Sequence, residues 1–146
     1  MRKLGSLLAA GAVVAFAAAA LAAGASMRTT IWTAALSSGK EVPKQTVRDT
    51  AAHGLFKGTL KGHTLKWRLT FAKLTGPAMQ AHIHKAAKGV SGPIVVALCA
   101  PCKNGQTGTS TISSALLSDF SKHLLYVNVH TAKNPNGEIR GQLAKG

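Results

Sequence analysis

Acidic residues are scarce in this 146-residue sequence, which carries 18 lysines and arginines and a formal net charge of +14 at pH 7. Its four acids are Glu41, Asp49, Asp119 and Glu138. So few carboxyl groups argue against a hydrolase that works with a pair of carboxylates. The basic excess attracts polyanions and raises their association rate, but it does not determine the fold.

Several catalytic and cofactor-binding motifs are missing as well. The sequence has no Gly-x-Ser-x-Gly elbow, no Gly-x-Gly-x-x-Gly fingerprint and no P-loop, which argues against serine hydrolases, dinucleotide enzymes and NTPases. The basic residues form no block of five like charges and no nucleic-acid-binding signature with aromatics, so no specific nucleic-acid binding is expected. Lys57, Lys66 and Arg68 are predicted to form a basic surface suited to an anionic polymer or surface outside the cytoplasm.

Only one long apolar run occurs, over residues 4–21, and it lies at the N-terminus. Arg2 and Lys3 precede it, and Ala23-Gly24-Ala25 offers a small-residue cleavage site before Ser26. This order predicts a helical signal peptide over residues 1–25, with an uncleaved membrane anchor as the alternative. Residues 26–146 then form one secreted, periplasmic or cell-envelope domain with no membrane span after cleavage.

Period-2 alternation is the main secondary-structure signal in the rest of the chain. Over residues 64–71 the odd positions are apolar and the even positions polar, as in a half-buried strand. The segment 124–131 is rich in β-branched and aromatic residues, which favour strands. Further strands are expected over residues 31–36, 54–60, 80–84, 94–98, 107–112 and 138–143.

Turn residues separate these strands, and helix is nearly absent. The segment 61–63 predicts a tight hairpin, and Asn134-Pro135-Asn136-Gly137 predicts a turn in which Gly137 takes a positive φ. Residues 113–121 are the one stretch of the mature chain compatible with a short helix. Many short strands with glycine-rich turns predict an all-β sandwich or barrel.

Three blocks in this sequence resemble the CHRD (chordin-type) domain. They cover residues 31–43, residues 81–84 with 89–96, and residues 126–131 with 134–142. The resemblance extends over about residues 30–143. It implies an all-β, immunoglobulin-like sandwich or barrel of secreted proteins. We expect the function to be that of a non-enzymatic exported binding or structural module.

Three histidines form a candidate metal site. His82 and His84 lie at i and i+2, so a strand would point both imidazoles to one face. His130 shares a strand face with Tyr126 and Asn128, and neighbouring strands would bring all three histidines together. Three imidazoles with an open position suit Zn or Cu. The alternative is that these histidines bind buried carbonyls and fix strand register.

This histidine arrangement is also similar to the copper ligands of Cu/Zn superoxide dismutase, another β-sandwich. The similarity implies that His82, His84 and His130 bind copper. Nothing corresponds to that enzyme's metal-bridging histidine or to its zinc aspartate. We therefore expect one metal ion at most, with redox activity as an open question, and we do not expect dismutase activity.

Two further pairs of residues bear on this interpretation. Cys99 and Cys102 predict a disulfide in an exported chain, because a thioredoxin-like role would need a helix where residues 103–105 suggest a loop. Glu138 and Arg140 share a strand face, where they would form an ion pair or, with Asn128, orient the metal-binding histidines.

Overall fold

The computed structural model describes residues 27–146, so the predicted signal peptide and its cleavage site lie outside the described residues. The elements in chain order are β1 Thr29–Ser37, η1 Ser38–Lys40, β2 His53–Lys61, β3 Thr64–Ala72, β4 Ala78–Lys85, β5 Ile94–Cys99, β6 Gln106–Thr111, α1 Ser114–Ser121, β7 Leu125–Thr131, β8 Ile139–Gln142 and β9 Ala144–Lys145. The eight expected strands and the short helix are confirmed. Within residues 27–146, no helix is long and apolar enough to cross a membrane.

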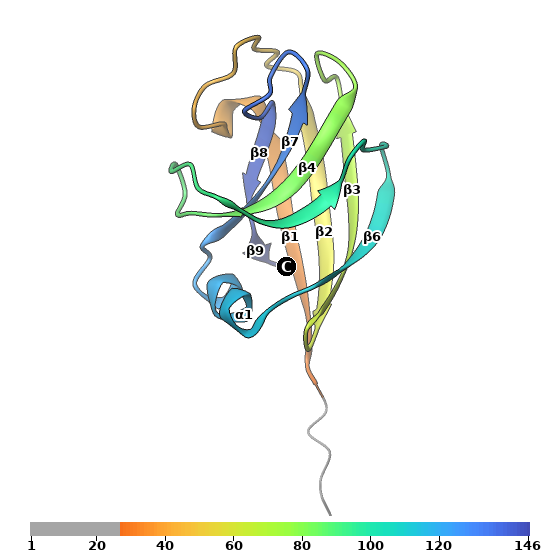
Figure 1. Ribbon diagram of the computed structural model, residues 1–146, viewed down its shortest axis with the longest axis vertical. Coiled ribbons are helices and arrows are strands. Elements are labelled where there is room, and N and C mark those ends of the chain that lie inside the picture. The colour runs from red at the N-terminus through yellow and green to blue at the C-terminus, as the bar shows by residue number, and fades with distance from the viewer. Residues whose placement is uncertain (1–26) are drawn as a thin grey trace, which may run out of the picture.

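The strands form one antiparallel sheet that curls into a nearly closed barrel or sandwich (Figure 1). Their order is β5-β4-β7-β8-β1-β2-β3-β6, and β9 pairs with β1. Strands β1 and β8 share only the residue pair Ser37 and Arg140. That narrow seam divides the sheet into two halves, β5-β4-β7-β8 and β1-β2-β3-β6, so the all-β sandwich prediction is confirmed.

The core consists of the inward residues of these strands. In β3, Leu65, Trp67 and Leu69 are buried while Lys66 and Arg68 are exposed, as the alternation predicts. Core residues from the other strands include Trp32, Phe56, Ile83, Val127, Val129 and Ile139. Helix α1 closes one end of the core, because its Phe120 ring packs at 5.0 Å from the Trp32 ring.

The predicted turns form as expected. Gly62 has a φ of 57° between β2 and β3, and the flanking Lys61 and Thr64 are paired. Gly137 has a φ of 125° before β8, and its amide donates to the Asn134 carbonyl at 3.1 Å. Both backbone conformations suit glycine because it has no Cβ.

Strand β7 is buried on both faces, and the candidate site lies on the face opposite the apolar core. Leu125, Val127 and Val129 point into the core. The opposite face carries Tyr126, Asn128 and His130, and these polar residues are buried as well. Loops before and after the paired strands cover that face, so a polar row lies in a protected layer outside the apolar core.

Candidate metal site

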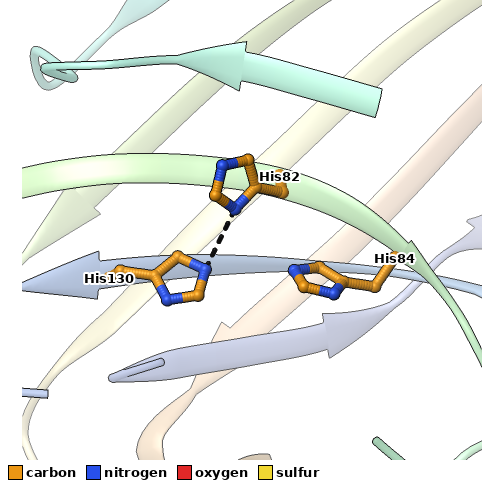
Figure 2. Close-up of side chains that lie close together, drawn as sticks. All are labelled: His82, His84 and His130. Carbon is orange, nitrogen blue, oxygen red and sulfur yellow. Dashed lines mark hydrogen bonds between the residues drawn. The ribbon is translucent and has the colours of Figure 1, made fainter. Parts of the chain in front are cut away.

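Two neighbouring strands bring the three histidines together. Strand β4 supplies His82 and His84, and β7 supplies His130. The register pairs His82 with Asn128 and His84 with Tyr126, so His130 lies one step along the same face. One nitrogen from each ring lies within 4.8 Å of the others (Figure 2). The predicted convergence of the three imidazoles is therefore present.

All three imidazoles are shielded from solvent. The exposed fractions are 7 % for His82, 8 % for His84 and 6 % for His130. Burial disfavours a charged imidazolium. It lowers the pKa of His82 to about 4, and the neighbouring His130 and His84 lower it further. Burial also lowers the pKa of His84 and of His130. The cluster is therefore neutral at pH 7, the form that binds metal.

Backbone carbonyls orient two of the rings. His84 Nδ1 donates to the Gly92 carbonyl at 2.9 Å, and His130 Nδ1 donates to the Pro135 carbonyl at 2.9 Å. Because a carbonyl oxygen only accepts, both Nδ1 atoms carry hydrogen and both Nε2 atoms present a lone pair. His84 Nε2 is buried and has no hydrogen-bond partner. Such carbonyl-anchored imidazoles are typical of metal-binding histidines.

The third ring completes the donor set. His82 Nδ1 lies 3.1 Å from His130 Nε2 (Figure 2). In the metal-free protein His82 Nδ1 donates this hydrogen bond, since His130 Nε2 is the acceptor. A metal ion would replace that hydrogen. Nitrogens bound to one Zn at ~2.0–2.1 Å in a tetrahedral arrangement lie about 3.3 Å apart, which is close to the observed separation.

Tyr126 links the histidines to Arg140. The Tyr126 ring stacks on His84 with centroids 4.9 Å apart, and the Arg140 guanidinium carbon lies 3.4 Å from its centroid. Since β7 lies between β4 and β8, these contacts reach Tyr126 from its two neighbouring strands. Asn128 lies near enough to His84 to raise its pKa slightly against the effect of burial. Asn128 therefore adjoins the site directly, and the positive charge of Arg140, which lies over the Tyr126 ring, lowers the pKa of His84.

Glu138 does not pair with Arg140 and does not orient His130. Its carboxylate accepts hydrogen bonds from the Thr75 amide at 2.6 Å, the Thr75 hydroxyl at 2.7 Å and the Thr131 hydroxyl at 2.6 Å. Arg140 Nη2 instead donates to the Val90 carbonyl at 2.8 Å. Glu138 is bound by hydroxyl and amide donors and Arg140 Nη2 by a carbonyl, so the expected ion pair is absent. Among residues 27–146 the ion pair that forms joins Lys85 and Asp119 at 2.9 Å.

Sequence reasoning missed two contributions to this region. The Gly92 and Pro135 carbonyls carried no signal, because any residue supplies a carbonyl and only the loop path brings it to a ring. Glu41 was also missed as part of this layer. It is 1 % exposed, and burial raises its pKa to about 8. The only sequence signal for Glu41 was its position in residues 31–43, the first of the three blocks that resemble the CHRD domain.

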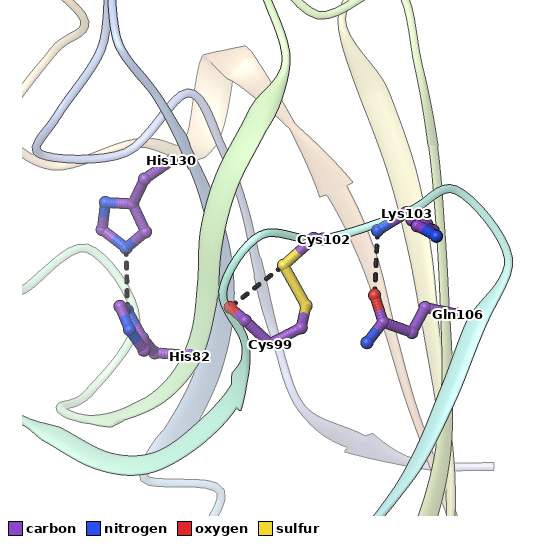
Figure 3. Close-up of a disulfide and its surroundings, with 6 residues drawn as sticks. All are labelled: His82, Cys99, Cys102, Lys103, Gln106 and His130. Carbon is purple, nitrogen blue, oxygen red and sulfur yellow. Dashed lines mark hydrogen bonds between the residues drawn. A yellow bond between two sulfur atoms is a disulfide. The ribbon is translucent and has the colours of Figure 1, made fainter.

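The predicted disulfide joins Cys99 and Cys102 at the end of β5 (Figure 3). The Cys102 amide donates to the Ala78 carbonyl at 3.0 Å, which fastens this turn to the start of β4. Residues after Cys102 form a loop leading into β6, so no helix begins there. The pair is placed to stabilise the end of the strand next to the histidines.

The basic residues also lie together. Lys57 pairs with Arg68 across β2 and β3, and Lys66 lies on the same outward face. All three are exposed and line a shallow hollow of about 580 Å³ with Thr107 and Thr109 of β6. Their position does not overlap the histidine cluster.

The fold and this cluster define an all-β sandwich with three convergent, buried histidines outside its apolar core. A family model described as the CHRD domain matches residues 32–143, so the chain belongs to the CHRD domain family. Membership implies a non-enzymatic binding or structural module. Comparisons with curated proteins and with solved structures gave no match.

Proposed function

We propose that this protein is an exported, non-enzymatic CHRD module that binds one Zn or Cu ion through His82, His84 and His130. The observation that carries the proposal is the convergence of three buried, neutral imidazoles, two of them already oriented by backbone carbonyls. The ligand atoms are His82 Nδ1, His84 Nε2 and His130 Nε2. Imidazole sets of this kind suit Zn and Cu and leave a fourth position open.

Metal content tests this proposal directly. Protein purified without an affinity tag and dialysed against equimolar Zn or Cu should retain one ion per chain, measured by plasma mass spectrometry. His82→Ala should retain less than a tenth of that amount, because removing one of three ligands weakens the site strongly. His53→Ala is the matched control, since His53 is exposed and lies outside the cluster. Equal metal content in the wild type and His82→Ala would overturn the proposal.

Spectroscopy distinguishes true coordination from adventitious binding. The Cu-loaded protein should show an electron paramagnetic resonance spectrum with nitrogen hyperfine structure from imidazoles. The same spectrum in His84→Ala and His130→Ala would contradict coordination by this cluster. Redox activity can be tested directly on the Cu-loaded protein. We do not expect that activity to include superoxide dismutation.

A second candidate function rests on the exposed basic face. Lys57, Lys66 and Arg68 point outward from neighbouring strands, which favours an anionic polymer or surface as partner. Binding to such a polymer should weaken steeply as salt increases and should survive chelation. Charge reversal at Lys57 and Arg68 should abolish it. Binding that is insensitive to both salt and these changes would exclude this face as the contact.

Export is part of the proposal and has its own test. The predicted signal peptide over residues 1–25 should be removed, so the secreted protein should begin at Ser26 by intact-mass spectrometry. An N-terminus at Met1 on exported protein would favour the uncleaved anchor.

A further inference from the structure

The loop between β4 and β5, residues 86–93, supplies the carbonyl that orients His84. The Gly92 carbonyl accepts the hydrogen bond from His84 Nδ1 at 2.9 Å. The hydrogen bond made by one ring nitrogen of a histidine determines which nitrogen stays free to bind a metal. The position of the Gly92 carbonyl therefore controls the ligand atom that His84 presents.

Arg140 holds the middle of this loop. Its side chain is buried, and its Nη2 donates to the Val90 carbonyl at 2.8 Å and, in a longer contact, to the Ala87 carbonyl at 3.4 Å. The Val90 amide also donates to the Ala87 carbonyl, so Arg140 binds both ends of one turn. Hydrogen bonds from a charged donor are stronger than those between neutral groups. This turn lies directly before Gly92, so Arg140 determines the path on which the loop reaches His84.

A second route leads from Arg140 to the same residue. The guanidinium carbon of Arg140 lies 3.4 Å from the centroid of the Tyr126 ring. The hydroxyl group of that ring accepts a hydrogen bond from the Gly92 amide at 3.2 Å. Both side chains come from paired strands, β7 and β8, so they hold the loop against the sheet.

The loop also passes very close to its own start. A Cβ on Gly92 would lie 2.0 Å from the carbonyl oxygen of Lys85, so this approach requires glycine. We propose that Arg140 is a positioning residue for the metal ligand His84. By holding the turn 87–90 it keeps the Gly92 carbonyl on His84 Nδ1, and Nε2 stays free for the metal. The effect on metal affinity rests on the proposed metal site, whereas the effect on the ring can be measured without metal.

Nuclear magnetic resonance of the metal-free protein tests this role. Long-range correlation spectra of protein with ¹⁵N-labelled histidine show which ring nitrogen carries the hydrogen, and His84 of the wild type should carry it on Nδ1. Arg140→Lys keeps the charge but cannot reproduce the guanidinium fork, so its His84 should show a mixture of both tautomers. His130 is held by the Pro135 carbonyl outside this loop, and its unchanged signals would report an intact fold. A wild-type state of His84 in Arg140→Lys would overturn the proposal.

Two further variants disturb the same carbonyl and leave the buried charge in place. Tyr126→Phe removes the hydroxyl that accepts from the Gly92 amide, and Gly92→Ala adds a Cβ that would collide with the Lys85 carbonyl. Both should produce the tautomer mixture at His84. Lys88→Gln changes an exposed residue of the same loop and should not. If neither of the two variants altered His84, or if Lys88→Gln altered it equally, the loop would not set this ring and the proposal would be overturned.

Zinc affinity provides the second readout. Groups that orient a metal ligand typically change metal affinity by about 10–100-fold. The affinity of Arg140→Lys for Zn, measured by competition with a chromophoric chelator, should therefore be about tenfold lower than that of the wild type. Equal affinities would overturn the proposal. If the wild type did not bind Zn or Cu at all, the proposed metal site would be refuted, while the tautomer of His84 would still decide the role of Arg140.

Discussion

Acid should destabilise the metal-free protein through His82. In the unfolded chain a histidine titrates near pH 6.5, whereas burial and the neighbouring histidines lower the pKa of folded His82 to about 4. The unfolded state therefore binds the proton more tightly. Stability from this residue is fully present above about pH 6.5 and is lost as the pH falls toward about 4. Linkage gives a loss of about 2.5 kcal/mol between about pH 8 and about pH 4.5.

Urea denaturation at these two pH values, followed by circular dichroism, measures this loss. The His82→Asn variant cannot take up the proton, so its free energy of unfolding should fall by about 2.5 kcal/mol less than that of the wild type. His53→Asn changes an exposed histidine and should behave as the wild type does. If His82→Asn and the wild type lost the same stability, His82 would not be the titrating group and the argument from its burial would fail.

Three further predictions concern stability. Burial raises the pKa of Glu41 to about 8, so the folding stability that this residue contributes is full below about pH 4.5 and is lost as the pH rises through 8. Glu41→Gln should therefore unfold at a higher urea concentration than the wild type at pH 9. Replacing Cys99 and Cys102 by alanine should lower the free energy of unfolding in urea by about 2 kcal/mol, since the disulfide closes a loop with a sequence separation of 3. An unchanged free energy would show that the bridge does not restrain the unfolded chain. Gly108→Ala should cost roughly 1–3 kcal/mol in thermal unfolding, because its new Cβ would collide with the Trp67 ring, and a wild-type melting curve would refute that packing.

Most of the fold could be predicted because its strands carry local signals. The alternation of Leu65, Trp67 and Leu69 with basic residues indicates a strand and its buried face. The β-branched residues of β7 do the same. Strand β9 was not predicted, since two residues are too few to show a period. The pairing order β5-β4-β7-β8-β1 also had no local signal, because strand neighbours depend on contacts between distant segments.

The candidate site was predictable to the extent that strand geometry determines it. Spacing placed His82 and His84 on one face, and the composition of β7 placed His130 on a strand. The pairing of β4 with β7 turned these separate facts into a cluster. The roles of Glu138 and Arg140 could not be predicted, since their partners are Thr75 in a distant loop, Thr131 at the end of β7 and backbone carbonyls of the loop after β4. Periodicity describes strands, whereas these contacts depend on how loops return across the sheet.

The single residue pair between β1 and β8 has a mechanical consequence. All three histidines belong to β4 and β7, two strands that pair directly with each other in one half of the sheet, so their spacing does not depend on how the halves sit together. A cavity of about 650 Å³ at this seam is lined by Ala35 and Lys40 on one side and by Arg140 and Gln142 on the other, so its walls come from both halves. A small sliding or hinging of one half against the other would therefore reshape that cavity while the imidazoles kept their relative positions.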